Sequence, residues 1–70
     1  MLYTYNIDVD CGPPQESANT EIKFATTTYG STAVYKCNLG YELSTGAQSL
    51  TRECLANGIW AGSIPTCNRK

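Results

Sequence analysis

Apolar and polar residues alternate along much of the chain, with the period of two that places successive side chains on opposite faces of a β-strand. In the stretch STAVYKC, for example, Ala33, Tyr35 and Cys37 fall on one face. No stretch carries an apolar period of 3.6 that is long enough for a helix. The alternation predicts strands in EIKFATT, STAVYKC, NLGYELS and SLTREC, which span residues 21–27, 31–37, 38–44 and 49–54.

Residues that favour turns separate these stretches. Gly40 marks a turn or a bulge, TGAQ at 45–48 forms a turn, and Asn57-Gly58 forms a tight turn because both residues readily adopt positive φ. The prolines of CGPP at 11–14 lack backbone donors and restrict the residues before them, so this segment is extended. The pattern predicts a small all-β domain with about five or six short antiparallel strands.

The predicted core is thin and combines large inward-facing residues with small residues at turns. Trp60 follows a glycine turn between two cysteines, so we expect its ring to cover a buried disulfide rather than to form an exposed binding site. Arg52 shares the alternation parity of Cys54, and either a bulge turns it outward or its stem packs while its head reaches solvent. The predicted structural residues are Phe24, Tyr35, Gly40, Tyr41, Leu43, Gly58, Trp60 and Pro65.

The chain has 70 residues and four cysteines. A domain of this size buries little surface, so small domains often depend on cross-links. The even cysteine count favours two disulfides and an oxidising compartment over buried free thiols. Zinc sites usually pair their ligands at short spacing, whereas these cysteines are widely spaced and histidine is absent. We therefore expect a disulfide-rich domain without a metal or other cofactor.

Four cysteines allow three pairings, and loop entropy does not choose among them. Pairing the first with the third and the second with the fourth differs by only about 1 kcal/mol from pairing the first with the second and the third with the fourth. Two motifs within the cysteine frame are more informative: C-x-x-G-Y-x-L at 37–43 and G-x-W-x-G-x-x-P-x-C at 58–67. With them, the sequence resembles the complement control protein module, also called the sushi domain or short consensus repeat, over residues 11–67.

The resemblance implies an elongated module with the pairing Cys11–Cys54 and Cys37–Cys67. It also implies that the first and last cysteines lie near opposite ends of the module, each tethering an extended, proline-containing segment. The sequence departs from the family pattern at several places, among them Arg52, which stands where an apolar residue is common, and the short segment ATTT before Tyr29. Thr20 stands where a glycine usually follows the asparagine, and Ala33 stands where valine is more usual.

The chain divides into one module and two flanks. Residues 11–67 form the module, and residues 68–70 are expected to begin an outgoing linker. Residues 1–10 are expected to be a linker or a flank added for expression, because they lack the basic and apolar regions of a signal peptide. We therefore expect a fragment of a larger extracellular protein.

The charge pattern narrows the possible partners. The formal net charge is −1 and the basic residues are scattered, so neither nucleic acid nor a heparin-type glycan is favoured. No apolar stretch is long enough to insert into a membrane. Without histidine, the chain lacks a Ser-His or Cys-His nucleophile pair, and we expect no enzymatic activity.

The resemblance implies a non-catalytic module for protein–protein recognition and spacing in a secreted or cell-surface protein of the complement, adhesion or receptor type. Its partners would be protein ligands and neighbouring extracellular modules. The alternative is a stand-alone secreted effector, such as an inhibitor or toxin, stabilised by disulfides. The sequence identifies no binding site. The weak candidates are exposed-type residues without a structural role, namely Lys23, Thr27, Glu42, Gln48 and Arg52.

Overall fold

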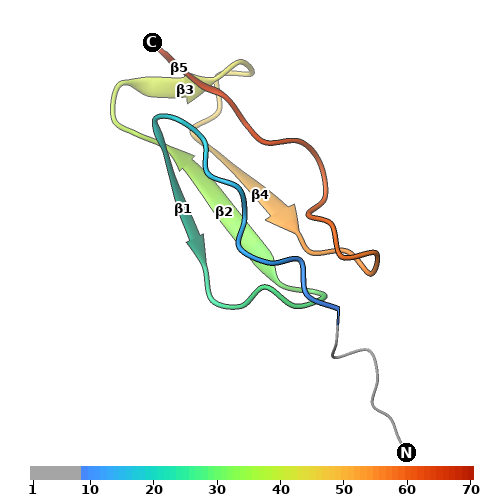
Figure 1. The fold of residues 1–70 in the computed structure, drawn as a ribbon. Coiled ribbons are helices and arrows are strands. Elements are labelled where there is room, and N and C mark those ends of the chain that lie inside the picture. Colours follow the sequence, from blue (N-terminus) through green and yellow to red (C-terminus); the bar gives the residue numbers. More distant parts are fainter. Residues whose placement is uncertain (1–8) are drawn as a thin grey trace, which may run out of the picture.

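The computed structural model describes residues 9–70; the flank expected at residues 1–8 lies outside the described residues. The described chain contains β-strands and no helix, which confirms the predicted all-β class. Figure 1 shows the strands in chain order: β1 (Thr20–Phe24), β2 (Thr32–Cys37), β3 (Tyr41–Leu43), β4 (Ser49–Glu53) and β5 (Cys67–Arg69).

The strands form two antiparallel sheets. The larger sheet has the order β1-β2-β4, and the smaller one pairs β3 with β5. In the larger sheet Tyr35 of β2 lies opposite Ile22 of β1 and Leu50 of β4. Every second residue of β2 is buried, because only one face of this sheet is covered. The alternation in STAVYKC therefore predicted β2 correctly.

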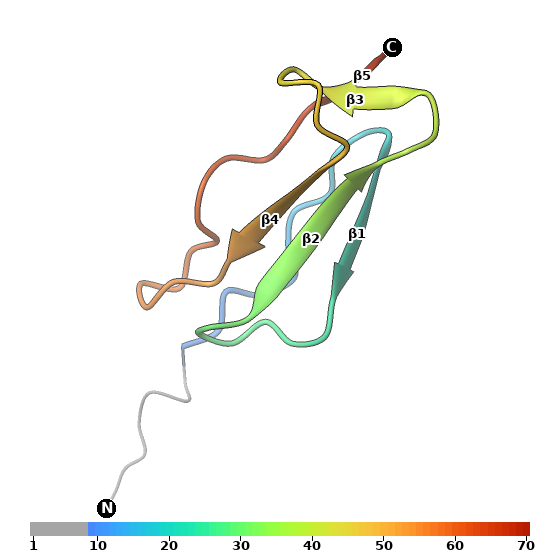
Figure 2. The ribbon, with the colours of Figure 1, turned by 180° about the vertical axis from the view of Figure 1, so that it is seen from behind.

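The larger sheet is covered by two segments without regular structure. One is the extended N-terminal segment and the other is the segment between β4 and β5, and both run alongside the sheet in Figures 1 and 2. Ser17 Oγ donates a hydrogen bond to the carbonyl of Pro65 at 2.8 Å, which joins the two covering segments. Pro14 in the first segment and Pro65 in the second are both buried. The prolines thus keep these segments extended and also contribute to the core.

The core consists of two separate clusters. The main cluster contains Ala33, Tyr35, Cys54 and Trp60, with Ile22 packed against its side. The second cluster lies in the smaller sheet and contains Cys37, Leu43 and Cys67, with the half-buried Tyr41 against it. Each cluster holds one disulfide, so the cross-links stabilise two small cores that have few apolar residues.

The described part of the chain is elongated, and it enters and leaves at opposite ends (Figure 1). At the entry end, the carbonyl of Val9 accepts a hydrogen bond from the Tyr29 amide at 3.0 Å. At the exit end, the Lys70 amide donates to the carbonyl of Gly40 at 2.9 Å. Both ends of the described part of the chain are therefore held by backbone hydrogen bonds.

Both expected flanks prove to be partly structured. Asp10 forms a β-bridge with Thr28, so the last residue of the expected N-terminal flank pairs with the module. Asn68 and Arg69 were expected to begin a linker, but they belong to β5 and pair with β3. β3 lies within the strand predicted at 38–44, whereas β5 is only three residues long and has no alternation that would reveal it in the sequence.

Phe24 is the clearest error in the predicted core. Its side chain is 44% exposed, although it has the inward parity of β1. β1 is an edge strand and Phe24 is its last residue, so Phe24 lies at a corner of the larger sheet. At this corner the extended N-terminal segment covers the side chain only in part. Phe24, Pro13 and Pro14 line an open hollow rather than a packed interface.

The small residues of the predicted core serve turns. Gly40 has a φ of 89° and is exposed, and Gly58 has a φ of 81°. These values require the left-handed conformation that glycine adopts without strain. Asn19, which precedes the departure at Thr20, also has a positive φ of 59°. The turn is therefore made by the asparagine itself, which tolerates this region better than most residues.

Candidate functional site

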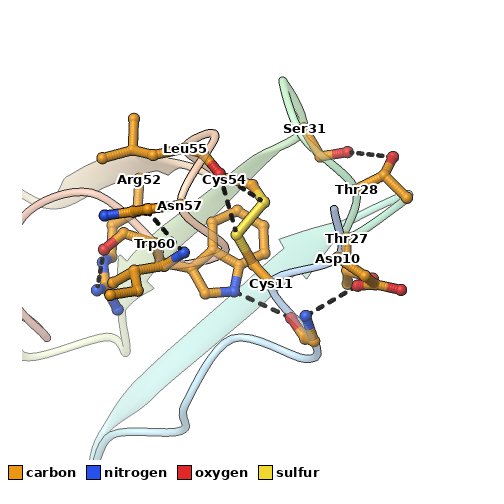
Figure 3. Close-up of a disulfide and its surroundings, with 12 residues drawn as sticks. Asp10, Cys11, Thr27, Thr28, Ser31, Arg52, Cys54, Leu55, Asn57 and Trp60 are labelled. Carbon is orange, nitrogen blue, oxygen red and sulfur yellow. Dashed lines mark hydrogen bonds between the residues drawn. A yellow bond between two sulfur atoms is a disulfide. The ribbon is translucent and has the colours of Figure 1, made fainter. Parts of the chain in front are cut away.

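The most constrained part of the molecule surrounds the disulfide between Cys11 and Cys54. The Trp60 ring lies against it (Figure 3), and this side chain is only 6% exposed. Trp60 Nε1 donates a hydrogen bond to the carbonyl of Gly12 at 3.0 Å. The indole therefore packs in the core and also holds the incoming segment through its polar edge, as buried tryptophans commonly do.

The second disulfide joins Cys37 to Cys67, at the end of the module where the chain leaves. Cys37 is the last residue of β2 and Cys67 is the first residue of β5. This bond therefore links the larger sheet directly to the smaller one. Leu43, opposite Cys67 in the register, completes the small core around it.

Arg52 lies at the centre of this region. The sequence predicted that its side chain turns outward or that its head reaches solvent, and both predictions are wrong. Arg52 is 8% exposed, so it is neither turned outward nor solvated at its head, and it is not an exposed binding candidate. Its guanidinium binds the carbonyls of Trp60 at 3.0 Å, Ala61 at 2.8 Å and Gly62 at 3.3 Å. These carbonyls belong to a segment that lies outside the named strands and has only an isolated bridge, from Trp60 to Cys54. Arg52 supplies the donors that a neighbouring strand would otherwise provide.

Tyr35 extends this polar network towards the N-terminal segment. Arg52 Nη1 donates a hydrogen bond to the Tyr35 hydroxyl at 3.2 Å, and the guanidinium carbon lies 5.7 Å from the centre of the tyrosine ring. The Tyr35 hydroxyl in turn donates to the carbonyl of Gln15 at 2.9 Å. Through these two side chains, β2 and β4 fix both covering segments. Alternation does not reveal this network, because it depends on the path of segments that have no periodicity.

Replacing Arg52 with methionine is expected to lower the free energy of unfolding by about 3 kcal/mol. Methionine fits an apolar site of similar size, but the carbonyls at 60–62 and the Tyr35 hydroxyl lose their partner. Urea unfolding monitored by circular dichroism measures the change. The matched control is Lys36→Met in the same sheet, which removes an exposed cation and should change stability by less than about 0.5 kcal/mol. Equal losses in the two variants would contradict this role for Arg52.

Thr27, one of the binding candidates, is instead engaged within the module. Its hydroxyl donates to Asp10 Oδ1 at 2.6 Å, and the Gly12 amide donates to the same oxygen at 2.9 Å. The bond from Thr27 is the main cause that holds the pKa of Asp10 below its ordinary value, and the bond from Gly12 adds to it. Asp10 thereby fixes the start of the module to the loop after β1.

Thr27→Val is expected to raise the pKa of Asp10 towards its ordinary value, whereas Thr27→Ser should leave it low. Because the pKa is lowered by folding, the ionised carboxylate contributes stability above roughly pH 4, and this contribution is lost as the pH falls through the folded-state pKa. Carbon-detected NMR titration of the Asp10 carboxyl measures the shift in each variant. An unchanged pKa in Thr27→Val would show that the hydroxyl does not stabilise the carboxylate.

The other candidates for binding lie apart from one another. Lys23 is exposed on β1, Glu42 is half-buried on β3, and Gln48 is exposed just before β4. No hydrogen bond or ion pair in the described part of the chain joins any two of them. Within residues 9–70, no group of three or more histidine, cysteine or acidic residues is placed to hold a metal ion. The same residues include no helix long and apolar enough to cross a membrane.

The comparison with protein families agrees with this geometry. The family described as "Sushi repeat (SCR repeat)" matches residues 11–67, from the first cysteine to the last. The chain belongs to the sushi repeat family. Sushi domains are non-catalytic interaction modules that are typically extracellular.

The chain is similar to parts of three longer proteins. The chain is 41% identical over 59 residues to "Sushi, von Willebrand factor type A, EGF and pentraxin domain-containing protein 1" of Mus musculus and 38% identical over 61 residues to its counterpart in Rattus norvegicus. It is 36% identical over 58 residues to "Protein lev-9" of Caenorhabditis elegans. These matches cover 84%, 87% and 83% of the chain, but only 2%, 2% and 9% of the relatives.

Proposed function

We propose that this sushi repeat is a non-catalytic extracellular module that binds a protein partner and sets the spacing of neighbouring modules. The parent would be a secreted or cell-surface protein of the complement, adhesion or receptor type. The observation that carries the proposal is the path of the chain, which enters at one end of an elongated body and leaves at the other (Figure 2). A module with this geometry separates its neighbours along one axis.

The cross-links support the recognition role. One disulfide lies towards each end, and the covering segments are fixed to the larger sheet by side-chain hydrogen bonds from Tyr35, Arg52 and Trp60. A surface that is already ordered loses little conformational entropy when a partner binds. The names of the mouse and rat relatives describe sushi domains combined with von Willebrand factor type A, EGF and pentraxin domains. A similar arrangement would give this chain its neighbours.

Surface plasmon resonance against a panel of purified ectodomains tests the recognition role. The panel contains complement components, adhesion receptors and cytokine receptors, and the control surface carries the same chain after reduction and alkylation. We expect dissociable binding of at least one ectodomain to the oxidised chain alone. If no ectodomain binds, or if the oxidised chain inhibits a secreted protease instead, recognition is not the function and the effector alternative gains support.

A further inference from the structure

A cavity of about 280 Å³ lies between the N-terminal segment and the segment that follows β4. Pro13 and Gln15 line it on the first side, and Ile59 and Ile64 line it on the second. Arg52 also borders the cavity and is the only charged residue among the described residues that does so. The cavity is thus an open hollow lined by both polar and apolar groups, with a single buried cation in its wall.

The charge of Arg52 has no counter-charge among the described residues. Its four hydrogen-bond acceptors are three backbone carbonyls and one hydroxyl, all of which are neutral. A guanidinium has five N–H donors, so one donor has no acceptor in the described part of the chain. Burial of a cation without an anion is costly, and a carboxylate is the group that satisfies its charge and donor geometry best.

We propose that this cavity binds an acidic side chain of a protein partner, with the carboxylate against Arg52. The proposal rests on the proposed recognition function and names the chemistry of its partner. Two exposed isoleucines of the lining favour an aliphatic residue next to the acidic one, because Ile59 is 60% exposed and Ile64 is 37% exposed. Ile64 also lines a second hollow of about 330 Å³, together with Leu43, Leu50 and Pro65, which can accept the aliphatic side chain.

A sulfated glycan fits the site less well than a protein carboxylate. Glycan binding depends on several cations that act together, and this cavity offers one. Lys23 and Lys36 have the opposite alternation parity to the inward residues of β1 and β2, so they lie on the other face of the sheet from Arg52. The single cation therefore favours one acidic residue rather than a polyanion.

The test is an NMR titration of the full chain with isovalerate, a carboxylate that carries a branched apolar tail. We expect a saturable shift of the Arg52 Nε–H signal, with a Kd on the order of millimolar for so small a probe. Isovaleramide has nearly the same shape without the charge and should give no saturable shift. Equal responses to the acid and the amide, or no response to either, would overturn the proposal.

A pair of variants at the exposed Ile59 makes the test specific to this cavity without removing Arg52. Ile59→Glu places a carboxylate at the mouth of the cavity and should weaken isovalerate binding about fivefold. Ile59→Gln is the matched neutral control, because it removes the same apolar side chain without adding a charge, and it should bind isovalerate more tightly than Ile59→Glu does. If the two variants bind isovalerate equally, the anion lies elsewhere and the proposal fails.

Two further outcomes separate this site from its alternatives. A heparin tetrasaccharide that shifts the Arg52 signal at lower concentration than isovalerate would assign the cavity to a glycan and would overturn the proposal. A second outcome would also overturn the proposal: isovalerate does not bind, and an ectodomain binds the two Ile59 variants with equal affinity. That result would leave the recognition function in place at another surface, so the two failures are distinguishable.

Discussion

Trp60→Ala is expected to lower the free energy of unfolding by about 4 kcal/mol, the typical cost of removing a large buried aromatic side chain. The ring is 6% exposed and packs in the main cluster with Tyr35 and Cys54. The substitution also leaves the carbonyl of Gly12 without its donor. A domain of 70 residues has a total stability of roughly 4–10 kcal/mol, so the variant should be largely unfolded or close to it.

Urea unfolding with intact disulfides, monitored by far-ultraviolet circular dichroism, measures this effect. Trp60→Phe retains most of the ring but loses the Nε1 hydrogen bond, so it isolates a contribution of about 1 kcal/mol beyond the change in ring size. Phe24→Ala is the matched control, because this aromatic residue is 44% exposed at the sheet edge and should cost about 1 kcal/mol. A Trp60→Ala loss no larger than that of Phe24→Ala would mean that the indole does not anchor the core.

The contrast between these two aromatic residues shows what alternation can and cannot predict. β2 was correctly placed because it is the central strand of its sheet and buries one whole face. The same parity failed for Phe24, because parity says which way a side chain points but not whether another segment covers it. Coverage at the edge of this sheet depends on the path of the N-terminal segment, which has no period.

The sequence named Arg52 among the candidates, but it did not predict the burial of this side chain or its hydrogen bonds, for the same physical reason. The parity of Arg52 placed it on the inner face, and this signal was correct. Its burial depends on three carbonyls at residues 60–62 that converge on one point. These carbonyls converge because of the path that the segment takes in three dimensions. The residue types along the segment do not predict that path. The sequence signal for this site was therefore an arginine at an inward-facing position of a strand, just before a segment without periodicity.

Removal of either disulfide is expected to destabilise the module by a similar amount but in different places. The bonds close loops with sequence separations of 43 and 30 residues. The loop-entropy estimate is about 4 kcal/mol for each. Both Cys11→Ala/Cys54→Ala and Cys37→Ala/Cys67→Ala should therefore unfold at much lower urea concentration than the natural chain.

Local contacts distinguish the two variants. The segment held by Cys11 keeps other attachments when that bond is removed, through Trp60 to Gly12 and through Tyr35 to Gln15. By contrast, β5 is held mainly by Cys67 and by its pairing with a three-residue strand, β3. Loss of the Cys37–Cys67 bond should therefore release β5 while β2 and β4 remain paired. This opening is local, and its free energy is smaller than that of global unfolding.

Amide hydrogen exchange on the two double variants tests this difference. In Cys37→Ala/Cys67→Ala, we expect the Lys70 amide, which binds the Gly40 carbonyl, to lose protection long before the amides of β2. In Cys11→Ala/Cys54→Ala, protection at Lys70 and in β2 should fall together, because the main cluster loses a fully buried sulfur. Uniform loss of protection in both variants would mean that the two small cores unfold as one unit, so that each end of the module depends on the other.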